Sequence, residues 1–161
     1  MNSRSAALLL HSREEPLRSL KPALEKLSIS SVRARSCGEA LKILKQANPP
    51  HIVFTDLTAS DSSWAEALGL SARSPVPVNL IVVSEVADLS LCKLAIECGA
   101  FDFMMSPAPE GELRPIVQRA VEDVVSRRGR GARLAKTASA SLAGGEIIKS
   151  VPAIARDRLS G

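Results

Sequence analysis

The sequence has very few aromatic residues, with three Phe, one Trp and no Tyr among 161 residues. A core this poor in rings must be packed from Leu, Val, Ile and Ala, which favours a small α/β or helical domain over a β-sandwich or barrel. The shortage also argues against proteins that bind single-stranded nucleic acid by stacking bases on several aromatic side chains. An apolar share of 45% allows one domain of about 100–150 residues with an appendage.

Cysteine is also scarce, and the three cysteines form no C-x-x-C pair. Neither a disulfide framework nor a zinc ribbon is indicated, and a reducing cytoplasm is the expected location. The first apolar run, Ala6–Leu10, is too short for the core of a signal peptide or for a membrane span. We therefore expect a cytoplasmic protein with no membrane segment.

Acidic residues are nearly missing from the C-terminal part of the chain. Residues 127–161 hold eight basic and two acidic side chains, whereas residues 1–126 hold 13 basic and 15 acidic ones. The later stretch is rich in Gly, Ser and Ala and has no long periodic pattern. We therefore predict a domain over residues 1–126 and a basic extension over residues 127–161, which is either a solvated linker or the start of an output module.

Short apolar runs alternate with segments of helical periodicity along residues 1–126. The runs predict five strands, at Ala6–Leu10, Ile29–Ala34, Ile52–Thr55, Leu80–Val83 and Phe101–Met105. Helices are predicted over residues 17–27, from a Ser36–Glu39 capping box to before Asn48, over Trp64–Arg73, from Asp88 to Cys98 and over Glu112–Val125. This alternation implies an α/β fold: a doubly wound, five-stranded parallel sheet of flavodoxin-like order 2-1-3-4-5.

Glycine-rich phosphate-binding loops are lacking too, since no G-x-G-x-x-G opens the first helix and there is no Walker motif. This argues against dinucleotide and P-loop nucleotide binding and, with the shortage of aromatic residues, against a flavin carrier. In a doubly wound sheet, ligands bind where the strands end at their carboxyl edge. The residues to consider therefore follow the strands, at His11–Glu15, Asp56–Thr58, Ser84–Glu85 and Ser106–Pro107.

Three segments carry a resemblance to a known family: V-F-T-D-L-T at 53–58, V-V-S at 82–84 and G-A-F-D-F-M-M-S-P at 99–107. In this combination and spacing they resemble the receiver domain of two-component response regulators, over about residues 5–126. The resemblance implies that Asp56 is the phosphoacceptor and that Ser84 offers a hydroxyl to the phosphoryl group. It also implies that Phe103 is the aromatic side chain whose rotamer reports the switch.

The same resemblance implies partners and a cofactor. A histidine kinase or phosphotransfer protein would donate the phosphoryl group, and Mg²⁺ would neutralise its oxygens. A protein partner or a second copy of the chain would bind the face formed by the fourth helix, fifth strand and fifth helix. Here that face consists of Ala87–Cys98, Phe101–Met105 and Glu112–Val125.

The sequence departs from the family at two chemical positions. Where the family has an acidic pair that binds Mg²⁺, this chain has Ser12 and Arg13 or, in a register shifted by one residue, His11 and Ser12. Ser106 replaces the lysine that contacts the phosphoryl group, although Pro107 is kept. These losses remove charges that are typically worth several kcal/mol in phosphoryl transfer. Ordinary Mg²⁺-dependent phosphorylation is therefore in doubt.

Three arrangements remain open for this edge. Glu14 or Glu15 could replace the missing metal ligands, Arg13 could occupy the cation site and pair with Asp56, or the pocket could hold no specific pair. His11 alone is better interpreted as a hydrogen-bonded surface residue than as a metal ligand. Cys92 and Cys98 are expected to be buried structural residues.

We therefore predict a signalling and protein-interaction module rather than an enzyme, with an atypical switch at Asp56. The alternatives are an adaptor that works without phosphorylation and the N-terminal regulatory domain of a DNA-binding transcriptional regulator. The arginines at 127–133 fit a patch that binds nucleic acid or an acidic partner, but they also fit a flexible linker.

Overall fold

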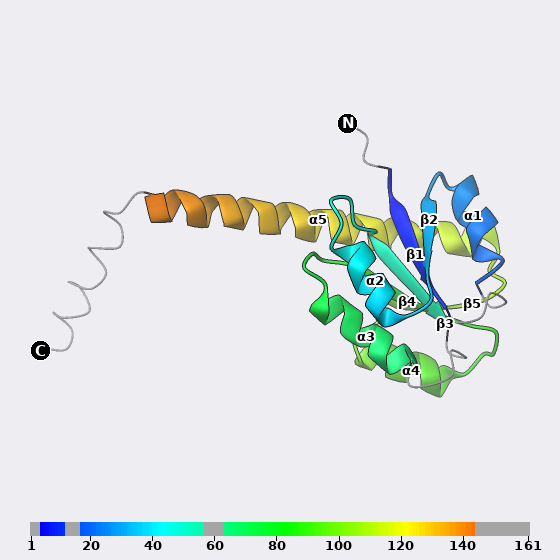
Figure 1. Cartoon of the computed structure of the whole chain (residues 1–161). Helices are drawn as coiled ribbons and strands as arrows, with labels where there is room; N and C mark the ends of the chain where they lie inside the picture. The colour runs from blue at the N-terminus through cyan, green and yellow to red at the C-terminus, as the bar shows by residue number, and fades with distance from the viewer. Residues whose placement is uncertain (1–3, 12–16, 57–62, 144–161) are drawn as a thin grey trace, which may run out of the picture. The chain divides into compact units, whose positions relative to one another are not determined.

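The computed structural model describes residues 4–11, 17–56 and 63–143. The chain divides into two compact units, Met1–Val125 and Ser126–Gly161. The first unit contains a parallel sheet whose strands are β1 (Ala6–Leu10), β2 (Ser30–Ala34), β3 (Ile52–Asp56), β4 (Asn79–Ser84) and β5 (Asp102–Met105) (Figure 1). Their order is β2-β1-β3-β4-β5 and every pair is parallel. The predicted fold class and strand order are confirmed.

The helices of the described residues are α1 (Leu20–Lys26), α2 (Cys37–Leu44), α3 (Ser63–Arg73), α4 (Leu89–Glu97) and α5 (Glu110–Ala143). Their ends follow local capping chemistry. The Ser36 hydroxyl accepts from the Glu39 N–H at 3.2 Å, and Asp88 Oδ1 accepts from the Leu91 N–H at 3.1 Å. Gly99 closes α4 with a φ of +108°, a conformation that L side chains rarely adopt. Asp61, a capping residue type just before α3, lies outside the described residues.

The two faces of the sheet carry different helices (Figure 1). α1 and α5 cover one face, where leucines such as Leu24 and Leu113 pack against Phe54 and Ile81. α2, α3 and α4 cover the other face, where Leu44 and Leu70 pack against Val53 and Val82. β3 and β4 are buried at every residue because both of their faces are covered, as their unbroken apolar runs predict.

α5 is much longer than the helix predicted over Glu112–Val125, and its residues belong to both units. The prediction that the last helix ends at Val125 is therefore wrong, because the helix continues to Ala143. It relied on the lack of apolar periodicity, but the Ala, Arg, Leu and Lys residues of this stretch have high intrinsic helix propensity. That propensity outweighs Gly129 and Gly131, each of which costs about 1 kcal/mol relative to Ala. None of the described helices is long and apolar enough to cross a membrane.

Candidate functional site at the carboxyl edge of the sheet

Four buried polar side chains lie at the carboxyl ends of four strands. His11 follows β1, Asp56 ends β3, Ser84 ends β4 and Ser106 follows β5. Asp56 is only 1% exposed, and the other three are 9% exposed or less. A buried polar group costs free energy unless it forms hydrogen bonds. The presence of four such groups at this edge therefore distinguishes it from the apolar core. The structure thus places one residue from each of the four predicted segments at this edge.

The alternation of side chains along each strand assigns these residues to faces. Leu9, Phe54 and Met104 all belong to the core on the α1 and α5 side. Two residues further along each chain come His11, Asp56 and Ser106, which therefore share that face. Ser84 is two residues beyond Val82, a residue of the opposite core, so it belongs to the α3 and α4 side.

The register of β1 and β3 decides which residue stands beside Asp56. Leu10 pairs with Thr55, so the next residues, His11 and Asp56, are neighbours across the two strands. The His11 N–H also continues the sheet by donating to the Ala34 carbonyl at 3.1 Å. His11 is 5% exposed; its interpretation as a surface residue is therefore wrong, because it prolongs a central strand.

These side chains form a poor donor set for Mg²⁺. Mg²⁺ prefers oxygen ligands in octahedral geometry, and the residue beside Asp56 is a histidine. Within the described ranges, no three His, Cys, Asp or Glu residues come together in a way that could hold a metal ion. The described part of this edge therefore does not fit the cofactor. Ser12, Arg13, Glu14 and Glu15 lie outside the described residues, so the arrangements that involve them stay predictions.

Ser106, which by resemblance replaces a lysine, makes a structural contact. Its hydroxyl lies 3.1 Å from that of Ser19, the residue just before α1, and either oxygen can be the donor. Its N–H donates to the Ser84 carbonyl at 2.9 Å, and the Ser106–Pro107 peptide bond is cis. A serine hydroxyl is short and neutral, so it joins β5 to the start of α1 but cannot supply the positive charge of a lysine.

The Ser84 hydroxyl closes a local turn. It donates to the Val86 carbonyl at 2.9 Å, and the Val86 N–H points back at it at 3.1 Å. This pattern, in which a side chain replaces a backbone group in a turn, orders the segment between β4 and α4. The role of Ser84 in offering a hydroxyl to a phosphoryl group stays a prediction.

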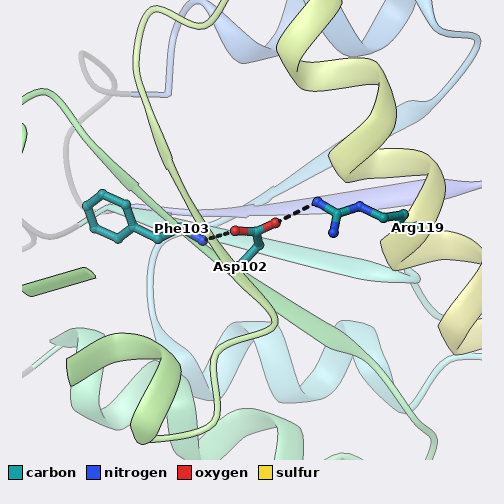
Figure 2. Close-up of polar contacts among 3 residues, drawn as sticks. All are labelled: Asp102, Phe103 and Arg119. Atoms are coloured by element: carbon teal, nitrogen blue, oxygen red, sulfur yellow. Dashed lines mark hydrogen bonds and ion pairs between the residues drawn. The ribbon is translucent and has the colours of Figure 1, made fainter. Parts of the chain in front are cut away.

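The two sides of β5 have different environments (Figure 2). Phe103 is half-buried and packs against the core under α2, α3 and α4. Its neighbour Asp102 accepts a hydrogen bond from the Phe103 N–H at 2.8 Å and pairs with Arg119 of α5 at 3.1 Å. Figure 2 shows the Phe103 ring pointing away from this ion pair. Because Arg119 is well exposed, the pair is expected to contribute no more than about 1 kcal/mol.

Large apolar side chains are exposed around α4 and β5. Leu89 is 86% exposed and Val86 is 67% exposed, and both Ile96 and Met105 are 43% exposed. We call these four residues the α4–β5 surface. Cys98, at the end of α4, is exposed as well, which contradicts the expectation that it is buried. Large apolar side chains with this much exposure favour a site of interaction.

Comparisons with known proteins identify the fold. No family model matches the sequence, and no curated protein matches it. A signal receiver domain of an HD domain-containing protein from Pseudomonas fluorescens Pf-5 is 24% identical with a TM-score of 0.68, covering 81% of this chain and 96% of that one. A response regulator receiver domain protein from Clostridium thermocellum is 23% identical with a TM-score of 0.63, covering 74% and 95%.

A response regulator protein from Burkholderia pseudomallei, solved with a phosphorylated aspartic acid, is 20% identical with a TM-score of 0.59. The match covers 76% of this chain and 71% of that one. The chain therefore has the fold of response regulator receiver domains.

Proposed function

We propose that this chain is a receiver-like module of two-component signal transduction, with Asp56 in the phosphoacceptor position, and that it acts through protein contacts and not as an enzyme. The observation that carries the proposal is the set of buried polar side chains at the carboxyl edge, with Asp56 at its centre. Doubly wound sheets place their chemistry at this edge. The phosphorylated aspartic acid of the Burkholderia pseudomallei structure shows that a protein of similar fold carries this modification.

We further infer that the switch is atypical. A phosphoryl group transferred to Asp56 brings negative charge, which metal ions and cationic side chains normally neutralise during phosphoryl transfer. Here His11 stands beside Asp56 and Ser106 is engaged with Ser19. With neither a Mg²⁺ donor set nor a lysine among the described residues of this edge, Mg²⁺-dependent transfer to Asp56 lacks its usual stabilisation.

The experiment is phosphorylation by acetyl phosphate and Mg²⁺, followed by intact mass. We expect no gain of a phosphoryl group by the wild-type chain, while a conventional receiver domain in a parallel reaction gains one. A restored variant, His11→Asp with Ser106→Lys, is expected to gain reactivity, and adding Asp56→Asn to it should abolish the gain. A phosphoryl group on Asp56 of the wild type would contradict the atypical switch.

The α4–β5 surface is the proposed partner-binding face, for a histidine kinase, a phosphotransfer protein or a second copy of the chain. Only the second copy can be tested with this chain alone. Sedimentation at several concentrations should show self-association that Leu89→Asp weakens and that Asp56→Ala leaves unchanged. Val32→Asp is the matched control, because Val32 is an exposed apolar residue of β2, at the opposite edge of the sheet. Equal effects of Leu89→Asp and Val32→Asp would contradict this face.

A second candidate function is nucleic-acid binding by the second unit. Arg127, Arg130, Arg133 and Lys136 recur at every third position of a helix, and Ser126–Ala143 contains no acidic residue. Residues three apart are neighbours on a helix surface, so these cations form a basic row that winds around the helix and places Arg127 and Lys136 on opposite sides. Partial burial, and to a lesser extent the charge of Arg127, lower the pKa of Arg128, but an arginine remains charged near neutral pH.

Salt dependence tests this second function. If the four cations of the row contact phosphates, the logarithm of the affinity for duplex DNA should fall with log salt with a slope of about −3 to −4. Replacing Arg130, Arg133 and Lys136 by Gln should make that slope shallower by about 3. Arg73→Gln, a substitution of an exposed cation of the first unit, should leave it unchanged. Absence of DNA binding, or an unchanged slope in the triple variant, would contradict the proposal.

A further inference from the structure

A cleft of about 460 Å³ opens beside α1, next to the edge strand β2 and its neighbour β1. One wall comes from Leu17, Arg18 and Lys21 at the start of α1, and the other from β2 with Arg33. A volume of this size lies within the range of small-molecule pockets, which is roughly 300–1,000 Å³. The cleft does not include Asp56, Ser84 or Ser106 among its described lining residues.

The walls of the cleft are positively charged. Arg18, Lys21 and Arg33 all line it, and its described lining contains no acidic side chain. The arginine of β2 is half-buried, whereas the two cations on the α1 side are exposed. Like charges on facing walls of a concave, low-dielectric surface raise the local positive potential and attract anions.

The deeper part of the cleft is apolar. Leu9 is 5% exposed and Leu17 is 1% exposed, and both line it beside the buried imidazole of His11. A cleft with cations at its walls and leucines at its base suits an amphipathic anion better than a bare inorganic ion. The imidazole adds nitrogen atoms that can donate or accept a hydrogen bond.

We propose that this cleft binds a small organic phosphate, with the phosphate between Arg18, Lys21 and Arg33 and the organic group over Leu9 and Leu17. The guanidinium of Arg18 and the ammonium of Lys21 carry two positive charges, which a phosphate dianion matches better than a monocarboxylate. The site goes beyond the proposed switch, because it needs neither Asp56 nor its phosphorylation.

The test is titration of the full chain with phenyl phosphate, followed by calorimetry and by amide chemical shifts. We expect saturable binding, with inorganic phosphate binding more weakly because it lacks the apolar group. Arg18→Gln with Lys21→Gln should weaken binding by at least about tenfold, since two charged donors are lost from exposed positions. The matched control is Lys42→Gln with Arg73→Gln, which removes two exposed cations of α2 and α3 and should leave the affinity unchanged.

Several outcomes would overturn the site. One is a lack of saturable binding, and another is equal binding by the Arg18→Gln/Lys21→Gln variant. Glu14 and Glu15 lie between two cleft residues in the sequence; binding seen only after Glu14→Gln with Glu15→Gln would mean that the chain's own carboxylates neutralise the cleft. Asp56→Ala should bind phenyl phosphate like the wild type. Loss of binding in that variant would mean that phenyl phosphate binds at the carboxyl edge. That result would contradict the cleft site but would leave the proposed switch unaffected.

Discussion

Replacing Ser106 by Ala removes one hydroxyl of the pair that joins β5 to the start of α1. The two oxygens are 3.1 Å apart, and the contact bridges residues that are 87 positions apart in the chain. If this hydrogen bond stabilises the fold, Ser19→Ala and Ser106→Ala should each lower the free energy of unfolding. The two losses should not add in the double variant.

The expected size follows from the chemistry of the pair. A neutral, partly buried hydrogen bond contributes about 0.5–1.5 kcal/mol net. We therefore expect each single variant to lower the free energy of unfolding by about 1 kcal/mol, and the double variant to lose about as much as one single variant. The resulting coupling energy is therefore about 1 kcal/mol in magnitude.

Equilibrium unfolding in urea measures this cycle. With a denaturant slope of about 1–3 kcal/mol per molar, a loss of 1 kcal/mol shifts the midpoint by about 0.3–1 M. A control cycle pairs Ser106→Ala with Ser71→Ala, whose hydroxyl bonds within α3 to the Leu68 carbonyl at 3.0 Å, and its coupling should be near zero. Additive losses for Ser19 and Ser106 would refute the structural role of the pair.

Three further predictions concern the first unit. Asn79→Ala should lower the free energy of unfolding by about 1–3 kcal/mol, because its buried amide donates to two oxygens of α5; a loss below about 0.5 kcal/mol in urea unfolding would contradict this. Gly99→Ala should cost about 1 kcal/mol through its φ of +108° alone, since nothing lies within 4 Å of an added Cβ, whereas Gly111→Ala, equally open but helical, should not destabilise. Burial raises the pKa of the Cys37 thiol, so at mildly alkaline pH iodoacetamide should modify exposed Cys98 first; peptide mass mapping that finds Cys37 modified first would refute it.

The strands and most caps could be predicted because their signals are local. Buried strands read as unbroken apolar runs, and caps such as Asp88 with Gly99 need only neighbouring residues. α1 is shorter than predicted, and Pro22 falls in its first turn, where its missing N–H leaves no helical hydrogen bond unmade. In a helix that began at residue 17, Pro22 would lie in the interior and would cause a kink. In the first turn of α1 it causes none.

Other features could not be predicted, either because they depend on tertiary contacts or because apolar periodicity and helix propensity disagree. The Ser19–Ser106 contact and the burial of His11 arise only when distant segments meet at the carboxyl edge. The length of α5 could not be predicted from apolar periodicity. The apolar stripe ends near Val125, whereas residues of high helix propensity continue to Ala143. The candidate residues Asp56, Ser84 and Ser106 could be chosen in advance, because the parallel topology by itself brings strand ends together.

We propose that this carboxyl edge provides no conventional Mg²⁺ site at Asp56. The most direct measurement is a Mg²⁺ titration of the wild-type chain, followed through the amide signals of His11, Asp56 and Ser106. We expect no saturable shift of these signals, even at Mg²⁺ concentrations far above those at which conventional receiver domains saturate. Saturable shifts of these three residues, lost in Asp56→Asn, would contradict it.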